Sequence, residues 1–154
     1  MRIVQVIRDC FDTMPDLAAF INEPRSEANI LTDNSASPFL ILNRPVDMPF
    51  NYVANNVEEI YDVLLIYGVV SPNTEYSNAQ DTHDIEIEAM RKQAKIMLLN
   101  LDKHPEVKSV SLTSPMRDYI NGFDVNASGI FQNLRITLLP MSPEPCASYP
   151  PPTP

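Results

Sequence analysis

The chain has 154 residues, 44% of them hydrophobic, and its 20 acidic and 11 basic side chains give a formal net charge of −9. A chain of this length can bury a sizeable core in one domain without disulfides or metals. The acidic charge disfavours direct DNA or RNA binding because it repels phosphates, yet it suits a protein that surrounds DNA without adhering to it. We expect no membrane association, because no apolar run is long enough to cross a bilayer.

Residues 2–14 are predicted to form a first helix, because apolar side chains recur there at three- and four-residue spacing. This stripe consists of Ile3 or Val4, Ile7, Phe11 and Met14. A further short turn is expected at residues 16–21, and the polar residues 22–37 are predicted to be a loop. Residues 39–43 (FLILN) lie between two prolines and predict a short buried strand.

Residues 44–56 predict a long connection that carries more apolar side chains than a solvated loop needs. Because long loops in compact domains are usually functional, we expect an interface here, with Phe50 and Tyr52 as contact residues. Residues 57–70 (VEEIYDVLLIYGVV) are predicted to be the strongest strand. Both of its faces are mostly apolar, so both should be buried, and Gly68 indicates a bulge or a close backbone approach.

Residues 81–104 predict a long amphipathic helix, which packs on the sheet together with the first helix. Its apolar face consists of Ile87, Met90, Ala94, Met97, Leu98 and Leu101. Acidic residues come first and basic residues follow, an order that compensates the helix macrodipole at both ends.

Residues 107–112 predict the next strand, which residues 117–120 would extend, and Asn121-Gly122 resembles a hairpin turn. Residues 130–138 alternate between apolar and polar and predict a half-buried antiparallel strand. The fold class is therefore α+β, with a mostly antiparallel sheet of about four strands in the order α-β-β-α-β-β. Residues 1–139 are predicted to form a single domain.

Residues 140–154 differ sharply in composition, since they hold seven of the fifteen prolines in the chain. Proline excludes a helix or a central strand, so these residues predict a proline-rich arm. Because the φ angle of proline is already restricted, the arm loses little entropy on binding, and we expect it to contact another protein. The contact residues predicted in it are Tyr149, Pro150, Pro151 and Pro152.

Residues that could carry chemistry do not form a recognisable site in the sequence. The acids and His83 within residues 81–88 match no metal-ligand spacing, and the helix dipole already accounts for them. His104 follows a helix C-terminus, and Cys10 and Cys146 are expected to be free thiols, with Cys10 buried and inert. Three glycines cannot build a phosphate-binding loop. We therefore expect no catalytic residues, no metal and no cofactor.

The element order resembles that of the tail-terminator and neck-ring proteins of tailed bacteriophages. The resemblance spans residues 1–139: a first helix, a loop, the PFLIL strand, the EEIYDVLLIYGVV strand, the helix from Asp81, and a final strand pair ending at Leu139. The proline-rich arm is not part of that pattern.

This resemblance implies a virion structural protein, made in the host cytoplasm, that forms a homo-oligomeric ring in the tail or head-tail neck. Neighbouring virion proteins would contact it, and DNA would pass nearby without specific binding. Subunit contacts would come from the strand pair after the long helix or from residues 44–56. Three alternatives stay open: a cytosolic protein-binding adaptor without catalysis, an acidic inhibitor that imitates DNA, and an enzyme.

Overall fold

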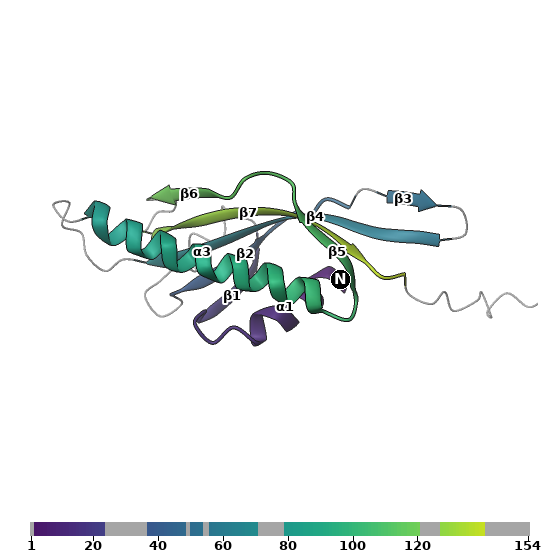
Figure 1. Ribbon diagram of the computed structural model, residues 1–154, viewed down its shortest axis with the longest axis horizontal. Helices are drawn as coiled ribbons and strands as arrows, with labels where there is room; N and C mark the ends of the chain where they lie inside the picture. The colour runs from purple at the N-terminus through teal and green to yellow at the C-terminus, as the bar shows by residue number, and fades with distance from the viewer. Residues whose placement is uncertain are drawn as a thin grey trace, which may run out of the picture.

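The structure, a computed structural model, describes residues 2–23, 37–48, 50–53, 56–70, 79–120 and 127–140 (Figure 1). This part of the chain holds two helices and seven strands, and the fold is α+β as predicted. The elements in chain order are α1 (Arg2–Asp12), β1 (Ala19–Glu23), β2 (Phe39–Asn43), β3 (Phe50–Val53), β4 (Asn56–Val70), α3 (Ala79–Lys103), β5 (Val107–Leu112), β6 (Arg117–Ile120) and β7 (Ala127–Leu138).

The sheet is organised around β4 and β7, which pair antiparallel from Glu59↔Leu138 to Val70↔Ala127. The other edge of β4 carries β3, then an isolated bridge between Asp47 and Asp62, then β2. The other edge of β7 carries β5 and then β6, also antiparallel. Only β1, which pairs with β2, is parallel to its neighbour among the described strands. The prediction of a mostly antiparallel sheet is confirmed.

The strand count exceeds the predicted four because three short strands depend on tertiary pairing. β1 forms where we expected a turn and the start of a loop, since β2 supplies its hydrogen-bonding partners. β3 lies inside the predicted connection 44–56 and pairs with the first residues of β4. β6 is a separate strand from β5, although both lie along β7. The predicted turn at residues 121–122 and most of the predicted loop 22–37 lie outside the described residues.

The main core lies between one face of the sheet and both helices, which Figure 1 shows on the same side. The predicted apolar stripe of α3 faces this core: its members are buried, except Leu98, which is partly buried. Alternate residues of β4, from Tyr61 to Tyr67, meet that stripe. The opposite face of the sheet buries a second cluster that includes Phe39, Ile41 and Ile66. The side of β4 that faces the helices is buried as predicted, whereas the other face is buried at Ile66 and Gly68 but only half-buried at Ile60 and Leu64.

Gly68 and Gly129 lie opposite each other on the two central strands. A Cβ atom at Gly68 would lie 2.3 Å from a ring carbon of Phe39 and 2.4 Å from the hydroxyl of Tyr119. The predicted close approach at Gly68 is therefore confirmed, and two aromatic rings occupy the space that a side chain would fill. The Tyr119 hydroxyl donates to the carbonyl oxygen of Tyr67 at 2.8 Å, which fastens β6 to the centre of the sheet.

A buried pair of hydrogen bonds connects the sheet to α3. The hydroxyl of Tyr67 donates to Oε1 of Gln132 at 2.7 Å, and Nε2 of Gln132 donates to the carbonyl of Ala94 at 3.0 Å. Tyr67, Gln132 and Ala94 are fully buried. Because a buried polar group without a partner is costly, this pair specifies how α3 sits on β4 and β7.

Candidate functional site

The β3–β4 hairpin projects from one end of the molecule (Figure 1). Residues 56–58 of β4 pair with β3 and precede the first β4–β7 pair, at Glu59. Phe50 and Tyr52, two of the predicted interface residues, lie on β3. Part of the connection that we predicted, residues 50–53, is thus a strand, and its hydrogen-bonded partner accounts for its apolar, strand-forming composition.

The chain leaves the sheet at the end where the hairpin projects. Glu59 pairs with Leu138, and Pro140 follows directly. Leu139, which follows β7, and Met48, which precedes β3, are 41% and 39% exposed. Two of the predicted contact segments, β3 and the start of the arm, therefore lie at one end of the molecule. Tyr149, Pro150, Pro151 and Pro152 lie outside the described residues, so their predicted contacts remain predictions.

Ion pairs surround the base of the hairpin. Arg2 of α1 lies 3.6 Å from Glu59 and 3.5 Å from Glu106, and Lys108 of β5 pairs with Glu58. The hydroxyl of Tyr61 donates to Glu59 at 3.1 Å. Partly exposed pairs contribute little stability, but together they connect the hairpin to α1 and β5 and restrict its direction.

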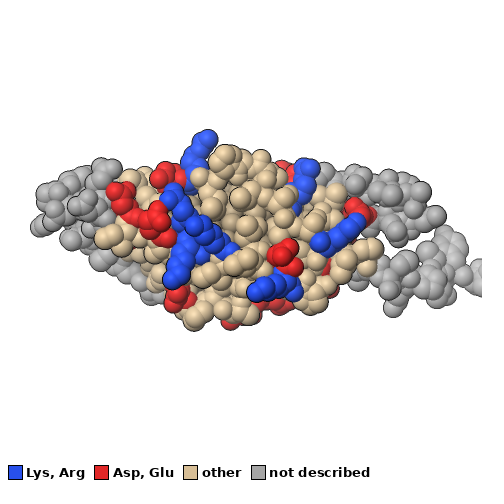
Figure 2. Space-filling view, in the orientation of Figure 1, with Lys and Arg blue, Asp and Glu red and all other residues tan. Residues whose placement is uncertain are grey.

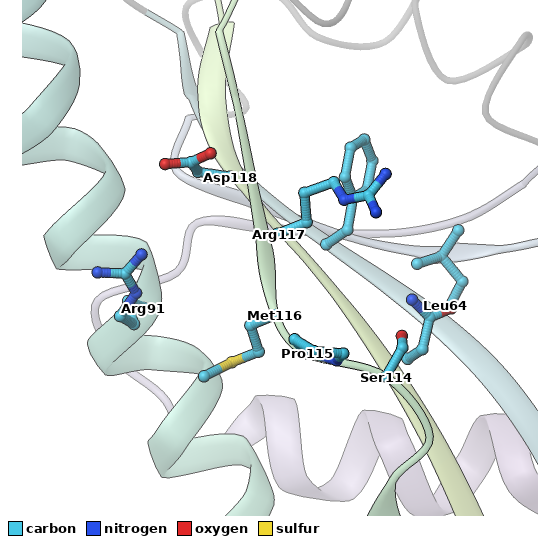
Figure 3. Close-up of a pocket in the computed structure, with 9 residues that line it drawn as sticks. Leu64, Arg91, Ser114, Pro115, Met116, Arg117 and Asp118 are labelled. Carbon is cyan, nitrogen blue, oxygen red and sulfur yellow. The ribbon is translucent and has the colours of Figure 1, made fainter.

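A cleft of about 520 Å³ opens where the chain passes from β5 to β6 (Figure 3). Residues 114–116 lie between the two strands. Leu64 of β4 and Phe131 of β7 form an apolar floor on one side of the cleft, whereas Met116 points toward α3 and packs against the core on the other face of the sheet (Figure 3). The remaining lining residues are Arg91, Ser114, Pro115, Arg117, Asp118 and Asn133. An apolar floor with hydrogen-bonding groups beside it is the usual composition of a site for a small ligand or a short peptide.

The two arginines of the cleft differ in their surroundings. Arg91 of α3 forms an ion pair with Glu88 one turn earlier. Arg117 is exposed on β6. Its guanidinium group, which carries five N–H donors, is therefore placed to bind carbonyl or carboxylate oxygens of a ligand.

A smaller cavity of about 150 Å³ brings Asp9, Cys10, Asn100 and His104 together between α1 and α3. Sequence spacing could not have shown this cluster, since α1 and the end of α3 are far apart in the chain. Nδ1 of His104 accepts the N–H of Glu106 at 3.1 Å, so its proton lies on Nε2, which contacts Asp9 at 3.1 Å.

This arrangement does not activate the thiol of Cys10. Both ring nitrogens of His104 are engaged elsewhere, and burial, followed by the nearby Asp9 charge, raises the pKa of Cys10 to about 11. Hydrogen bonds from Gln5 and then His104 lower the pKa of Asp9. The prediction that the thiol is buried is confirmed, and its raised pKa disfavours the reactive thiolate form. The cluster links the two helices through the contact between Asp9 and His104. Cys146 lies outside the described residues.

The acidic side chains and the histidine of residues 83–88 do not converge on one point of α3. His83 is buried with Nδ1 3.6 Å from Glu86, which accepts a hydrogen bond from Ser128 at 2.5 Å, whereas Asp84 and Glu88 are exposed. No group of three His, Cys, Asp or Glu side chains that could hold a metal occurs among the described residues. In Figure 2, acidic side chains gather over one end of the helix face and basic ones over its middle, in the order predicted from the sequence.

Comparison with known proteins identifies no relative: no family model matches the chain, and no curated protein matches it significantly. In the described part of the chain, neither helix is long and apolar enough to cross a membrane.

Proposed function

We propose that the chain is a structural subunit of a ring in the tail or head-tail neck of a tailed bacteriophage, of the tail-terminator or connector type. The ring surrounds the DNA channel, contacts neighbouring virion proteins and performs no catalysis. The observation that carries this proposal is the projecting β3–β4 hairpin, at the end of the molecule from which the proline-rich segment leaves. A projecting hairpin contributes little to its own core and presents backbone groups to a neighbour.

The edges of the sheet favour assembly in which one edge of a subunit contacts the opposite edge of the next. The strands β3, β5 and β6 each have an outer edge without a partner among the described strands. Of these, β3 lies beside β4, whereas β5 and β6 both lie beside β7. Edge strands expose N–H and C=O groups that pair readily with another chain. Because these edges lie on opposite sides of the sheet, contact between them is heterologous, and heterologous contacts that close generate rings.

The charge of the chain is compatible with a channel for DNA. With a net charge of −9, the subunit repels phosphates rather than binding them, so DNA can slide past it without sequence-specific contact.

Sedimentation and negative-stain images of the purified chain test the ring. We expect closed oligomers of uniform size. Changing Phe50 and Tyr52 together to alanine should weaken assembly while leaving the circular dichroism spectrum intact. A chain that remains monomeric at high concentration would refute the ring.

Deleting residues 141–154 tests the arm separately. All the described buried residues precede it, so the truncated chain should remain folded but assemble less well. Loss of the folded state in the truncated chain would show that the segment belongs to the core and that its interpretation as an arm is wrong.

The cleft at β5 and β6 favours a second candidate, a monomeric adaptor that binds a partner peptide. A stable monomer that binds peptides through this cleft would support the adaptor over the ring.

A further inference from the structure

The geometry points to an occupant for the cleft: residues 149–152 (YPPP) of a neighbouring copy of this chain. This inference rests on the proposed ring, since it names the surface that receives the arm of the next subunit. It joins two features that the fold leaves apart, the cleft between β5 and β6 and the proline-rich segment after β7.

The chemistry of the cleft fits three consecutive prolines. Three consecutive prolines, Pro150, Pro151 and Pro152, are the composition that favours a bound polyproline II helix, which has an apolar surface and no internal hydrogen bonds. Proteins bind such helices in grooves lined by aromatic and apolar side chains, with donors beside them for the free carbonyls. Phe131 lines the floor of the cleft, and Arg117 supplies exposed N–H donors.

The size of the cleft selects a short piece of the arm. Its volume of about 520 Å³ lies within the range of roughly 300–1,000 Å³ that is typical of sites for small ligands. A few residues fill such a space. The prolines at positions 150–152 are consecutive, and Tyr149 beside them adds a large, rigid anchor, whereas the earlier prolines of the arm are isolated.

The direction of the chain favours the cleft of a neighbour over the cleft of the same copy. The cleft extends along β7 as far as Asn133, and β7 then runs away from it for five residues to Leu138, or roughly 17 Å. To return, the chain would have to reverse its direction after Pro140. No glycine follows Gly129, and the prolines at positions 140, 143 and 145 restrict φ, so a tight reversal is disfavoured.

The length of the arm is sufficient for a neighbour. Residues 140–149 span about 30 Å in a polyproline II conformation. When the arm of each subunit enters the cleft of the next, the contact is heterologous, and repeating it around an axis generates a ring if the rotation closes.

The test uses the full chain carrying P150A, P151A and P152A, whose own arm should not fill the cleft. Fluorescence anisotropy measures the binding of a labelled peptide with the sequence of residues 139–154. Adding Ser114→Trp places a large ring in the cleft (Figure 3). The matched control is Ser111→Trp, at an exposed position of β5 that does not line the cleft.

We expect the labelled peptide to bind saturably to the triple-alanine chain and to its Ser111→Trp version. Binding to the Ser114→Trp version should be weaker by about tenfold or more, which is the size of effect that loss of an anchor residue produces. The charge reversal Arg117→Glu, at an exposed position, should have the same effect and covers the case in which Ser114→Trp does not fold. Sedimentation of the otherwise wild-type chain should show that Ser114→Trp also weakens assembly.

Two results would overturn the inference in distinguishable ways. Equal peptide affinity in the two tryptophan variants, with an assembling wild-type chain, would reject the cleft while the ring stands. A wild-type chain that stays monomeric would reject the ring and, with it, occupancy of the cleft by a neighbour.

Discussion

Replacing Tyr67 by phenylalanine removes one hydroxyl from the middle of the core and leaves the ring in place. Tyr67 and Gln132 are both fully buried, and the lost bond of 2.7 Å leaves Oε1 of Gln132 without its donor. An unpaired buried acceptor costs about 1–3 kcal/mol. Because burial raises the pKa of Tyr67 well above its ordinary value, the hydroxyl stays protonated and the cost should not depend on pH near neutrality.

The companion change Gln132→Leu should cost a similar amount, because it leaves the Tyr67 hydroxyl and the Ala94 carbonyl without the amide. In the double variant, neither the hydroxyl nor the amide remains to be satisfied. We therefore expect the double variant to be destabilised by less than the sum of the two single changes, with a coupling of about 1 kcal/mol or more.

Urea unfolding followed by circular dichroism measures all four proteins, with unchanged slopes as the control for a common unfolding transition. Thermal melting gives an independent measure, since each kcal/mol shifts the midpoint by about 2–4 °C in a domain of this size. Additive free energies would refute the claim that Tyr67 and Gln132 act as one buried unit.

The remaining predictions concern the sheet centre, the thiol and a surface pair. Gly129→Ala should destabilise the fold more than Gly68→Ala, since its Cβ meets backbone at 1.8 Å, whereas Gly68 faces side-chain ends; equal melting points would contradict this. With the other cysteine changed to serine, Cys10 should react with a thiol reagent at pH 8 only upon unfolding, because its pKa of about 11 leaves little thiolate. Hydrogen bonds from Arg135 at 2.7 and 2.8 Å lower the pKa of Asp62. This pair therefore stabilises the fold above the unfolded-state pKa of about 3.9, and its contribution is lost as the pH falls through the lowered pKa of the folded state. The difference in unfolding free energy between the wild-type chain and Arg135→Gln should therefore shrink in acid; a difference that does not diminish as the pH is lowered would contradict the assignment.

The candidate surfaces differ in how far the sequence could reveal them. Phe50 and Tyr52 could be named as candidate contact residues because a long proline-bounded connection carried apolar residues. The strand conformation of these residues could not be predicted from the sequence. The cleft was not identifiable, because Leu64, Arg91 and Phe131 lie on three elements that meet only in the folded sheet. The same holds for the Cys10–His104 cluster, and nothing in the local pattern around Gln132 indicates that it is buried.

The sequence by itself determined the elements whose apolar residues repeat with a regular period. The stripe of α3, the two apolar faces of β4 and the alternation of β7 each encode their own conformation locally, and each was correctly predicted. Tertiary structure alone decided the short strands β1, β3 and β6, the strand order, and the places where cavities open. The physical reason is that a short strand gains its stability from hydrogen bonds to a distant partner, and its own residues do not specify which partner that is.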